Sequence, residues 1–142
     1  MTNTVYDTTV VVYANADLIG RRSGNRLDRR LRVLEEFIQG SRIAFYNKKL
    51  FKEYEDHLSN QRNDVIEVFL IQLIDTGSYV RRSTLSRQNF DRASRSNWPA
   101  HDQHLLAAAI EATGVTIFVT ENHLACCANS IRREFDIEVV KV

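Results

Sequence analysis

The chain has 142 residues, of which 44% are hydrophobic and 26% charged, with a formal net charge of +1. This is the ordinary composition of one globular domain, and it excludes a disordered or fibrous protein. We therefore expect a single domain over residues 1–142. No apolar run is long enough to span a membrane, and residues 1–9 lack the basic start and apolar stretch of a secretory signal. We expect a cytoplasmic protein with no membrane partner.

The first half of the chain predicts alternating strands and helices. Residues 10–13 are a β-branched run typical of a buried strand, and leucines at helical spacing predict a helix over 27–38, before Gly40. Residues 42–46 predict a second strand, and Asn47 is placed to cap the helix that follows. Another helix is predicted from about residue 64 to residue 77.

The second half continues this alternation after an irregular stretch. Residues 81–98 are polar and rich in arginine, without a clear period, and predict a long surface loop. An Ala- and Leu-rich helix after Pro99, a strand at 117–120, a short helix over 122–130 and a strand at 137–142 follow. This order predicts an α/β fold of three layers, α/β/α, with a central and mostly parallel sheet.

Polar residues follow two of the predicted strands. Asn15 and Asp17 come after the first strand, and Glu121 and Asn122 come after the strand at 117–120. Ligands of open parallel sheets bind outside the carboxyl ends of the strands, where the strand order reverses. We therefore expect these two strands to be neighbours and Asp102, at the start of its helix, to face the same crevice.

Several short patches resemble PIN domains, which are metal-dependent ribonucleases. Residues 101–109 (His-Asp-Gln-His-Leu-Leu-Ala-Ala-Ala) and 114–124 (Gly-Val-Thr-Ile-Phe-Val-Thr-Glu-Asn-His-Leu) resemble the second half of that family. Residues 10–15 stand where the family has a strand ending in Asp-x-Asn, and Glu53 with Tyr54 is similar to its Glu-Tyr pair. The resemblance implies a carboxylate cluster that holds Mg²⁺ or Mn²⁺, whose bound water attacks a phosphodiester.

The resemblance also implies roles for individual residues. It assigns catalysis to Glu53, Asp102, Asn122 and Asn15, and metal binding to Asp102 and Glu53, to which we add Asp17 as a metal ligand four residues beyond Tyr13. The family's first Asp falls on Tyr13 and its last on Asn122, so the acidic site is expected to be partly degraded. Weak metal binding and slow or absent cleavage are the expected consequence. Asp17 or Glu121 could supply a displaced carboxylate.

Simpler explanations of the same residues stay open. Glu53 could be an exposed helix residue neutralised by Lys49 and Lys52, and Asp102 could be only an acid at a helix start. Asn15 could be a turn or cap residue. The spacing of the four histidines is not that of zinc ligands, and we expect them at surface or helix-face positions. They are His57, His101, His104 and His123. Dinucleotide-binding, P-loop and Ser or Cys nucleophile motifs are absent from the sequence.

All but four of the 19 basic residues are arginines, and most of these lie in two stretches. Because the planar guanidinium binds phosphate in a bidentate manner, we predict RNA contacts at part of each stretch. The predicted contacts are Arg21, Arg22, Arg26, Arg81, Arg82 and Arg87. Phe90 and Trp98 could stack on bases. Arg32 is instead expected to pair with Asp28 on a solvated helix face, and the second stretch could also bind an acidic partner.

Two functions follow from these observations. The first is an endoribonuclease of the PIN type, dependent on Mg²⁺ or Mn²⁺, toxin-like and controlled by an antitoxin-like protein. The alternative is a non-catalytic PIN-like module that binds RNA or protein, and an assembly subunit and a homodimer are further options. Convergence of Glu53, Asp102 and either Asp17 or Glu121 would favour the enzyme.

Overall fold

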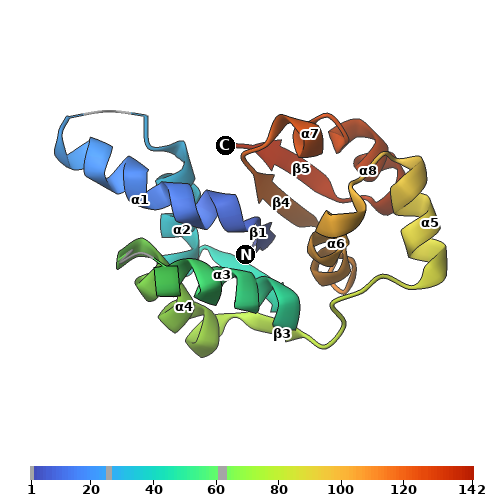
Figure 1. Ribbon diagram of the computed structural model, residues 1–142, viewed down its shortest axis with the longest axis horizontal. Helices are drawn as coiled ribbons and strands as arrows, with labels where there is room; N and C mark the ends of the chain where they lie inside the picture. Colours follow the sequence, from blue (N-terminus) through green and yellow to red (C-terminus); the bar gives the residue numbers. More distant parts are fainter. Residues whose placement is uncertain (1, 25–26, 61–63) are drawn as a thin grey trace.

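Five parallel strands form the central sheet of the computed structural model, which describes residues 2–24, 27–60 and 64–142 (Figure 1). The strands are β1 (Thr2–Tyr6), β2 (Arg42–Asn47), β3 (Ser78–Val80), β4 (Val115–Val119) and β5 (Glu138–Lys141). Their order is β3-β2-β1-β4-β5, and every neighbouring pair is parallel. The prediction of a parallel α/β sheet is therefore confirmed.

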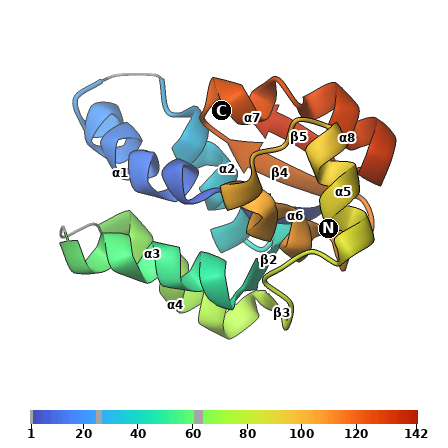
Figure 2. The same cartoon turned by 45° about the vertical axis from the view of Figure 1, so that its right-hand side comes forward.

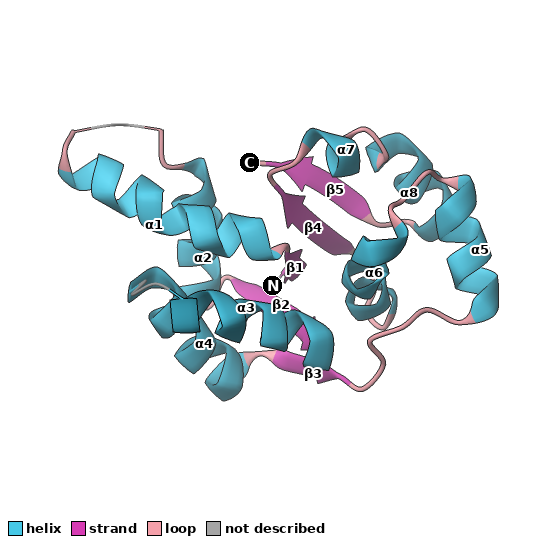
Figure 3. Ribbon diagram, viewed as in Figure 1, coloured by secondary structure: helices cyan, strands magenta, loops and turns pink. Residues whose placement is uncertain are grey.

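Helices cover both faces of this sheet. They are α1 (Thr8–Arg22), α2 (Arg29–Ile38), α3 (Lys48–Asn60), α4 (Asp64–Thr76), α5 (Arg87–Arg95), α6 (Gln103–Ile110), α7 (Asn122–Ala125) and α8 (Ala128–Phe135), with one 3₁₀ turn, η1 (Ala100–Asp102). Helices α1 to α4 pack together as one group, whereas α6 contacts β1, β2 and β4, and α7 and α8 contact β5 (Figures 2 and 3). The result is the expected three-layer α/β/α arrangement.

The first strand lies earlier in the chain than the sequence predicted. Residues 10–13 belong to α1, so the prediction of a strand there is wrong. Val10, Val11, Ala14 and Asp17 are buried, and this spacing is helical in spite of the β-branched run. The true strand, β1, occupies the centre of the sheet, where Thr4 and Val5 are fully buried.

The arginine-rich stretch is also more regular than predicted. Helix α5 occupies the middle of the predicted loop, and the Ser86 side chain caps it by accepting from the backbone N–H of Asn89. The predicted cap at Asn47 is confirmed, because its Oδ1 accepts from the backbone N–H of Leu50 at 3.1 Å. Its Nδ2 donates to the carbonyl of His104 at 2.9 Å, which joins α3 to α6.

Aromatic packing fixes the end of β1. The ring of Tyr6 is buried against Phe69 and Phe118, with ring centroids 5.7 and 5.8 Å away. The Tyr6 hydroxyl donates to the carbonyl of Val33 at 2.6 Å, and the Tyr54 hydroxyl donates to the Tyr6 carbonyl. Because these polar groups are hydrogen-bonded and the core around them is close-packed, the end of β1 is held in one well-defined position.

The strand order reverses at β1. From β1 the chain first builds β2 and β3 on one side, and it later adds β4 and β5 on the other. The carboxyl ends of β1 and β4 therefore lie side by side at the switch point where ligands bind in such sheets. The strand expected beside the one at 117–120 was residues 10–13, which are helical, and β1 takes that place next to β4. Within the described residues, no helix has the length and apolarity to cross a membrane.

Candidate functional site

Asp7 is the first residue after β1 and lies at the switch point. Its backbone N–H donates to the carbonyl of Phe118 in β4 at 3.0 Å, and the residue is only 6% exposed. Its Oδ2 accepts from the Thr9 hydroxyl at 3.1 Å, and Thr120 donates to that hydroxyl at 2.7 Å. A polar chain thus crosses from the end of β1 to the end of β4.

The carboxylate of Asp7 is held in an environment that opposes its negative charge. Burial is the largest cause that raises its pKa, and the negative charges of Asp102 and Glu121 raise it as well. The hydrogen bond from Thr9 only partly offsets these effects, so the pKa of Asp7 is about 6. Two carboxylates from separate parts of the chain therefore lie within electrostatic range of Asp7. A bound cation would relieve this mutual repulsion.

Asp102 is positioned by its own backbone. Its N–H donates to the carbonyl of Pro99 at 3.0 Å, and its carbonyl accepts from the indole N–H of Trp98 at 2.9 Å. The side chain makes no capping hydrogen bond to α6, which argues against a purely helix-terminal role. Instead, its Oδ2 lies 3.2 Å from Nε2 of His101 and 3.6 Å from Nε2 of His123.

Glu121 reaches the same region from the loop after β4. Its Oε2 lies 3.0 Å from Nε2 of His123. Among the described residues, the ion pairs of Asp102 and Glu121 are with histidines, so neither carboxylate is neutralised by a Lys or Arg there. That Glu121 supplies a displaced carboxylate next to Asn122 stays a prediction.

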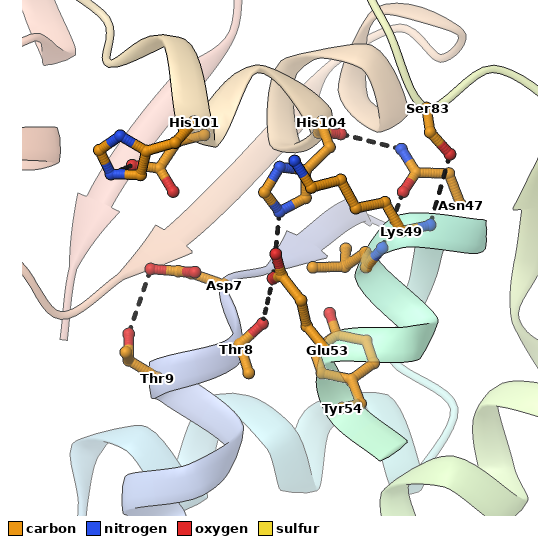
Figure 4. A network of polar contacts seen from close by, with 12 residues as sticks. Asp7, Thr8, Thr9, Asn47, Lys49, Glu53, Tyr54, Ser83, His101 and His104 are labelled. Atoms are coloured by element: carbon orange, nitrogen blue, oxygen red, sulfur yellow. Dashed lines mark hydrogen bonds and ion pairs between the residues drawn. The ribbon is translucent and has the colours of Figure 1, made fainter. Parts of the chain in front are cut away.

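Glu53 on α3 points toward Thr8 and His104, next to the end of β1 (Figure 4). Its Oε2 accepts from the Thr8 hydroxyl at 2.9 Å and lies 3.1 Å from Nε2 of the buried His104. Burial alone would raise the pKa of Glu53, but the hydrogen bond and charge of His104 and the bond from Thr8 outweigh it and hold the pKa below its ordinary value. Lys49 contributes less than these contacts, which disfavours the explanation of Glu53 as a merely exposed helix residue.

The structure gives Asp17 a different role from the predicted metal ligand. Asp17 is buried within α1, where its Oδ1 accepts from the guanidinium of Arg30. Its Oδ2 accepts from the backbone N–H groups of Arg30 and Leu31 at 3.0 and 3.1 Å. Both oxygens are thus occupied in joining α1 to the start of α2, and the carboxylate is not available to a metal.

The other predicted site residues at these strands are also displaced. Tyr13 lies on α1, 46% exposed and beneath the guanidinium of Arg30, and Asn15 is half-buried in the same helix. Neither follows a strand, because the strand predicted before them is part of α1. Asn122 begins α7, is exposed, and accepts a hydrogen bond from Lys141. Its carboxamide is therefore occupied by a cation rather than by its acidic neighbours.

The predicted RNA contacts divide into two groups. Arg21 binds Asp28 and Glu35 with its guanidinium, so its prediction as a phosphate contact is not supported. The predicted pair of Arg32 with Asp28 is confirmed at 2.7 Å. Arg26 lies outside the described residues. The remaining predicted contacts are exposed: Arg22, Arg81, Arg82 and Arg87.

Aromatic stacking by Trp98 does not fit its position. Trp98 is only 4% exposed, and its indole N–H is occupied by the Asp102 carbonyl. The proposed stacking on bases is therefore wrong for Trp98, whereas Phe90 is 36% exposed on α5. Trp98 acts instead as a support for Asp102.

Sequence reasoning missed two parts of this site. Asp7 was passed over because the preceding residues are mostly polar, although Thr4, Val5 and Tyr6 form a short β-rich run directly before an acid. His101 and His123 are 22 positions apart and meet only through the contact of η1 with the start of α7. The first signal was present in the sequence, and the second depends on tertiary structure.

Comparisons with protein-family models, with curated proteins and with solved structures find no match to the chain. The donor chemistry of the site is consistent with a hard divalent cation, because carboxylate and hydroxyl oxygens are the ligands that Mg²⁺ and Mn²⁺ prefer. Asp7, Asp102 and Glu121 supply the charge, and Thr9 and Thr120 supply neutral oxygens.

Proposed function

We propose that this protein is a PIN-like endoribonuclease that requires Mg²⁺ or Mn²⁺. The observation that carries the proposal is the burial of Asp7 at the switch point between β1 and β4, within electrostatic range of Asp102 and Glu121. Carboxylates brought together by distant segments, with one pKa raised to about 6, are typical of functional sites. Acidic side chains on an ordinary protein surface can turn away from one another and so avoid repulsion between their carboxylates.

Asp7 changes the argument about a degraded site. The family has a strand that ends in Asp-x-Asn, an acid followed two positions later by a neutral polar residue. Asp7-Thr8-Thr9 has this character directly after β1, whereas residues 13–15 do not follow a strand. The first acidic position is therefore filled, and Glu121 lies next to Asn122 at the last one. The expectation of slow or absent cleavage loses its main support, so we favour an active enzyme.

Individual residues take distinct roles in this proposal. Asp7 and Asp102 would hold the cation, and Thr9 fixes the orientation of the Asp7 carboxylate. Glu53, kept ionised by His104 and Thr8, positions the first turn of α1 behind Asp7. A bound Mg²⁺ or Mn²⁺ would supply an activated water and charge stabilisation for phosphodiester hydrolysis.

RNA as the substrate is supported by exposed arginines and by the family resemblance. Arg81, Arg82 and Arg87 are exposed after β3, where their guanidinium groups can pair with phosphates. The rival proposal is a non-catalytic module that binds RNA or protein through the same surface. It predicts RNA binding that does not depend on Asp7.

The decisive experiment incubates a labelled single-stranded RNA with the protein in Mn²⁺, in Mg²⁺ and in EDTA. We expect cleavage with Mn²⁺ or Mg²⁺ and none in EDTA. Asp7→Asn and Asp102→Asn should each lower the rate by about 100-fold or more, since even outer partners of a metal site are worth about 10- to 100-fold. Asp56→Asn, which changes an exposed acid on α3, is the matched control and should keep full activity.

Two outcomes would count against the enzyme. Absence of cleavage by the parent protein, together with intact RNA binding, would favour the binding module. Cleavage that persists in Asp7→Asn, or in EDTA, would indicate a contaminating nuclease or a different site. Circular dichroism of each variant excludes loss of the fold as the cause.

A further inference from the structure

A cluster of two histidines and one carboxylate lies beside the proposed nuclease site. His101 in η1, Asp102 at its end and His123 in α7 each offer one ligand atom, and all three atoms lie within 4.8 Å of one another. This arrangement was not expected, since the spacing of the histidines along the chain predicted no metal ligands. We propose that His101, Asp102 and His123 form a binding site for a divalent transition-metal ion of borderline softness, such as Zn²⁺.

The distances in the cluster are compatible with three ligands of one metal ion, and only the shorter one also fits a hydrogen bond. Asp102 Oδ2 lies 3.2 Å from Nε2 of His101 and 3.6 Å from Nε2 of His123. A separation of 3.6 Å is too long for a hydrogen bond. Ligands bound tetrahedrally at about 2.0–2.1 Å from Zn²⁺ are separated by roughly 3.3 Å, which lies between the two observed values.

The donor set explains why this ion differs from Mg²⁺. Imidazole nitrogen binds Zn²⁺ and other late transition metals well, whereas Mg²⁺ prefers oxygen ligands and retains its waters. Two imidazoles and one carboxylate leave a fourth position open, as in sites where a zinc-bound water is used. Glu121 Oε2 lies 3.0 Å from Nε2 of His123, but Glu121 does not belong to the group whose ligand atoms all lie within 4.8 Å of one another.

The surroundings hold the ligands in place while leaving the ion access. The backbone of Asp102 is fixed by Trp98 and Pro99, and its side chain is only 15% exposed. The side chains of His101 and His123 are 78% and 46% exposed, so an ion can enter from solvent. Their rings are tilted by 37° with centroids 6.3 Å apart, so they are not stacked on each other.

Because Asp102 belongs to both sites, occupation by Zn²⁺ would compete with the cation of the proposed nuclease. Binding of Zn²⁺ itself requires neither RNA nor catalysis. The inference therefore goes beyond the proposed function and can be tested while that function fails.

The test is calorimetric titration of the full chain with ZnCl₂ and with MgCl₂ at pH 7.5. We expect one Zn²⁺ per chain at this site and much weaker binding of Mg²⁺. The double variant His101→Asn/His123→Asn should bind Zn²⁺ about 100-fold less tightly, since loss of even an outer partner costs about 10- to 100-fold. His57→Asn, on the exposed face of α3, is the control and should bind as the parent does.

A second readout identifies the ligand atoms and keeps the inference separate from cleavage. In ¹⁵N NMR spectra, the Nε2 signals of His101 and His123 should shift on addition of Zn²⁺, and those of His57 should not. Asp7→Asn is expected to keep zinc binding even though it abolishes the proposed cleavage. Equal Zn²⁺ affinity in the parent and the double variant, or no binding by the parent, would overturn the inference.

Discussion

Glu53 of α3 and His104 of α6 lie 3.1 Å apart, and the same carboxylate oxygen accepts a hydrogen bond from Thr8, the residue after Asp7. This contact joins α1, α3 and α6 near Asp7 (Figure 4). Among the described residues, no hydrogen-bond partner is found for the buried His104 Nδ1, so the contact of its Nε2 with Glu53 is the polar contact that holds the ring. Glu53 is thereby the acceptor on which both neighbours depend.

Replacing Glu53 by Gln is expected to destabilise the protein at neutral pH. The pKa of Glu53 is lowered on folding, so its stabilising effect is present above its ordinary value of 4.5 and is lost as the pH falls through the lower folded value. Because the side chain is 35% exposed, we expect a loss of only about 1 kcal/mol in the free energy of unfolding at pH 7. Urea titrations at pH 7 and pH 3 measure it. A difference that is the same at both pH values would contradict the charge argument.

Asp7→Asn should have the opposite effect on stability. The pKa of Asp7 rises from 3.8 to about 6 on folding, so the folded protein binds more protons than the unfolded chain between these values. Stability therefore falls as the pH rises from about 4 to about 6. Asn carries no charge and should raise the free energy of unfolding of metal-free protein at pH 7 by up to about 3 kcal/mol.

Denaturation in EDTA at pH 7 and pH 4 tests this prediction. The gain from Asp7→Asn should be present at pH 7 and absent at pH 4, where the parent carboxyl is protonated. A variant that is less stable than the parent at both values would show that Asp7 is a structural acid. Such a result would also remove the observation that supports the nuclease.

Trp98→Phe tests whether the indole of Trp98 holds Asp102 in position. The substitution removes the indole N–H that binds the Asp102 carbonyl, which should cost about 1–2 kcal/mol for the buried group left without its partner. Zn²⁺ and Mn²⁺ affinity should fall with it, because the ligand loses its anchor. Metal-free binding to single-stranded RNA, measured by fluorescence anisotropy, should not change. A loss of RNA affinity in EDTA would mean that Trp98 contacts bases after all.

Replacing Arg81, Arg82 and Arg87 together by Ala should weaken RNA binding. All three are exposed, and each lost phosphate contact reduces counterion release, by about 0.7 in the logarithmic salt slope for single strands. We expect the slope to become shallower by about 2. The matched control replaces three exposed arginines elsewhere, Arg29, Arg132 and Arg133. An equal loss in both variants would indicate a general charge effect rather than a binding surface.

The second half of the fold was predictable because its signals are local. Pro99, the Ala- and Leu-rich helix and the apolar run before Thr120 each follow from spacing or composition within a few residues. The first strand was not predicted, because β1 is Thr-rich and Asn-containing while the Val10–Val12 run imitates a strand. A run of three β-branched residues cannot by itself distinguish a buried helix from a strand.

The candidate site was predicted only in part for a related reason. Asp102 and Glu53 were found because motifs surround them, and Glu121 because it neighbours Asn122. Asp7 was lost with the misplaced strand, and that error also moved Asp17 and Asn15 into the predicted site. The meeting of His101 with His123 depends on how η1 packs beside α7, which no spacing along the chain encodes.

Tyr13→Asp and Asn122→Asp now lead to different expectations, although both restore an acid that the family pattern seemed to lack. Tyr13 lies on the exposed part of α1 near Arg30, so Tyr13→Asp should leave Mn²⁺ affinity unchanged. Asn122 neighbours Glu121 but accepts from Lys141, so Asn122→Asp would form an ion pair and gain little affinity by itself. Removing that competitor as well, in Asn122→Asp/Lys141→Met, should free the new carboxylate and strengthen Mn²⁺ binding measured by calorimetry. The single variant Lys141→Met is the control and should bind Mn²⁺ nearly as the parent does. Stronger binding by Tyr13→Asp, or no gain in the double variant over both single variants, would show that the cation is held elsewhere than at the ends of β1 and β4.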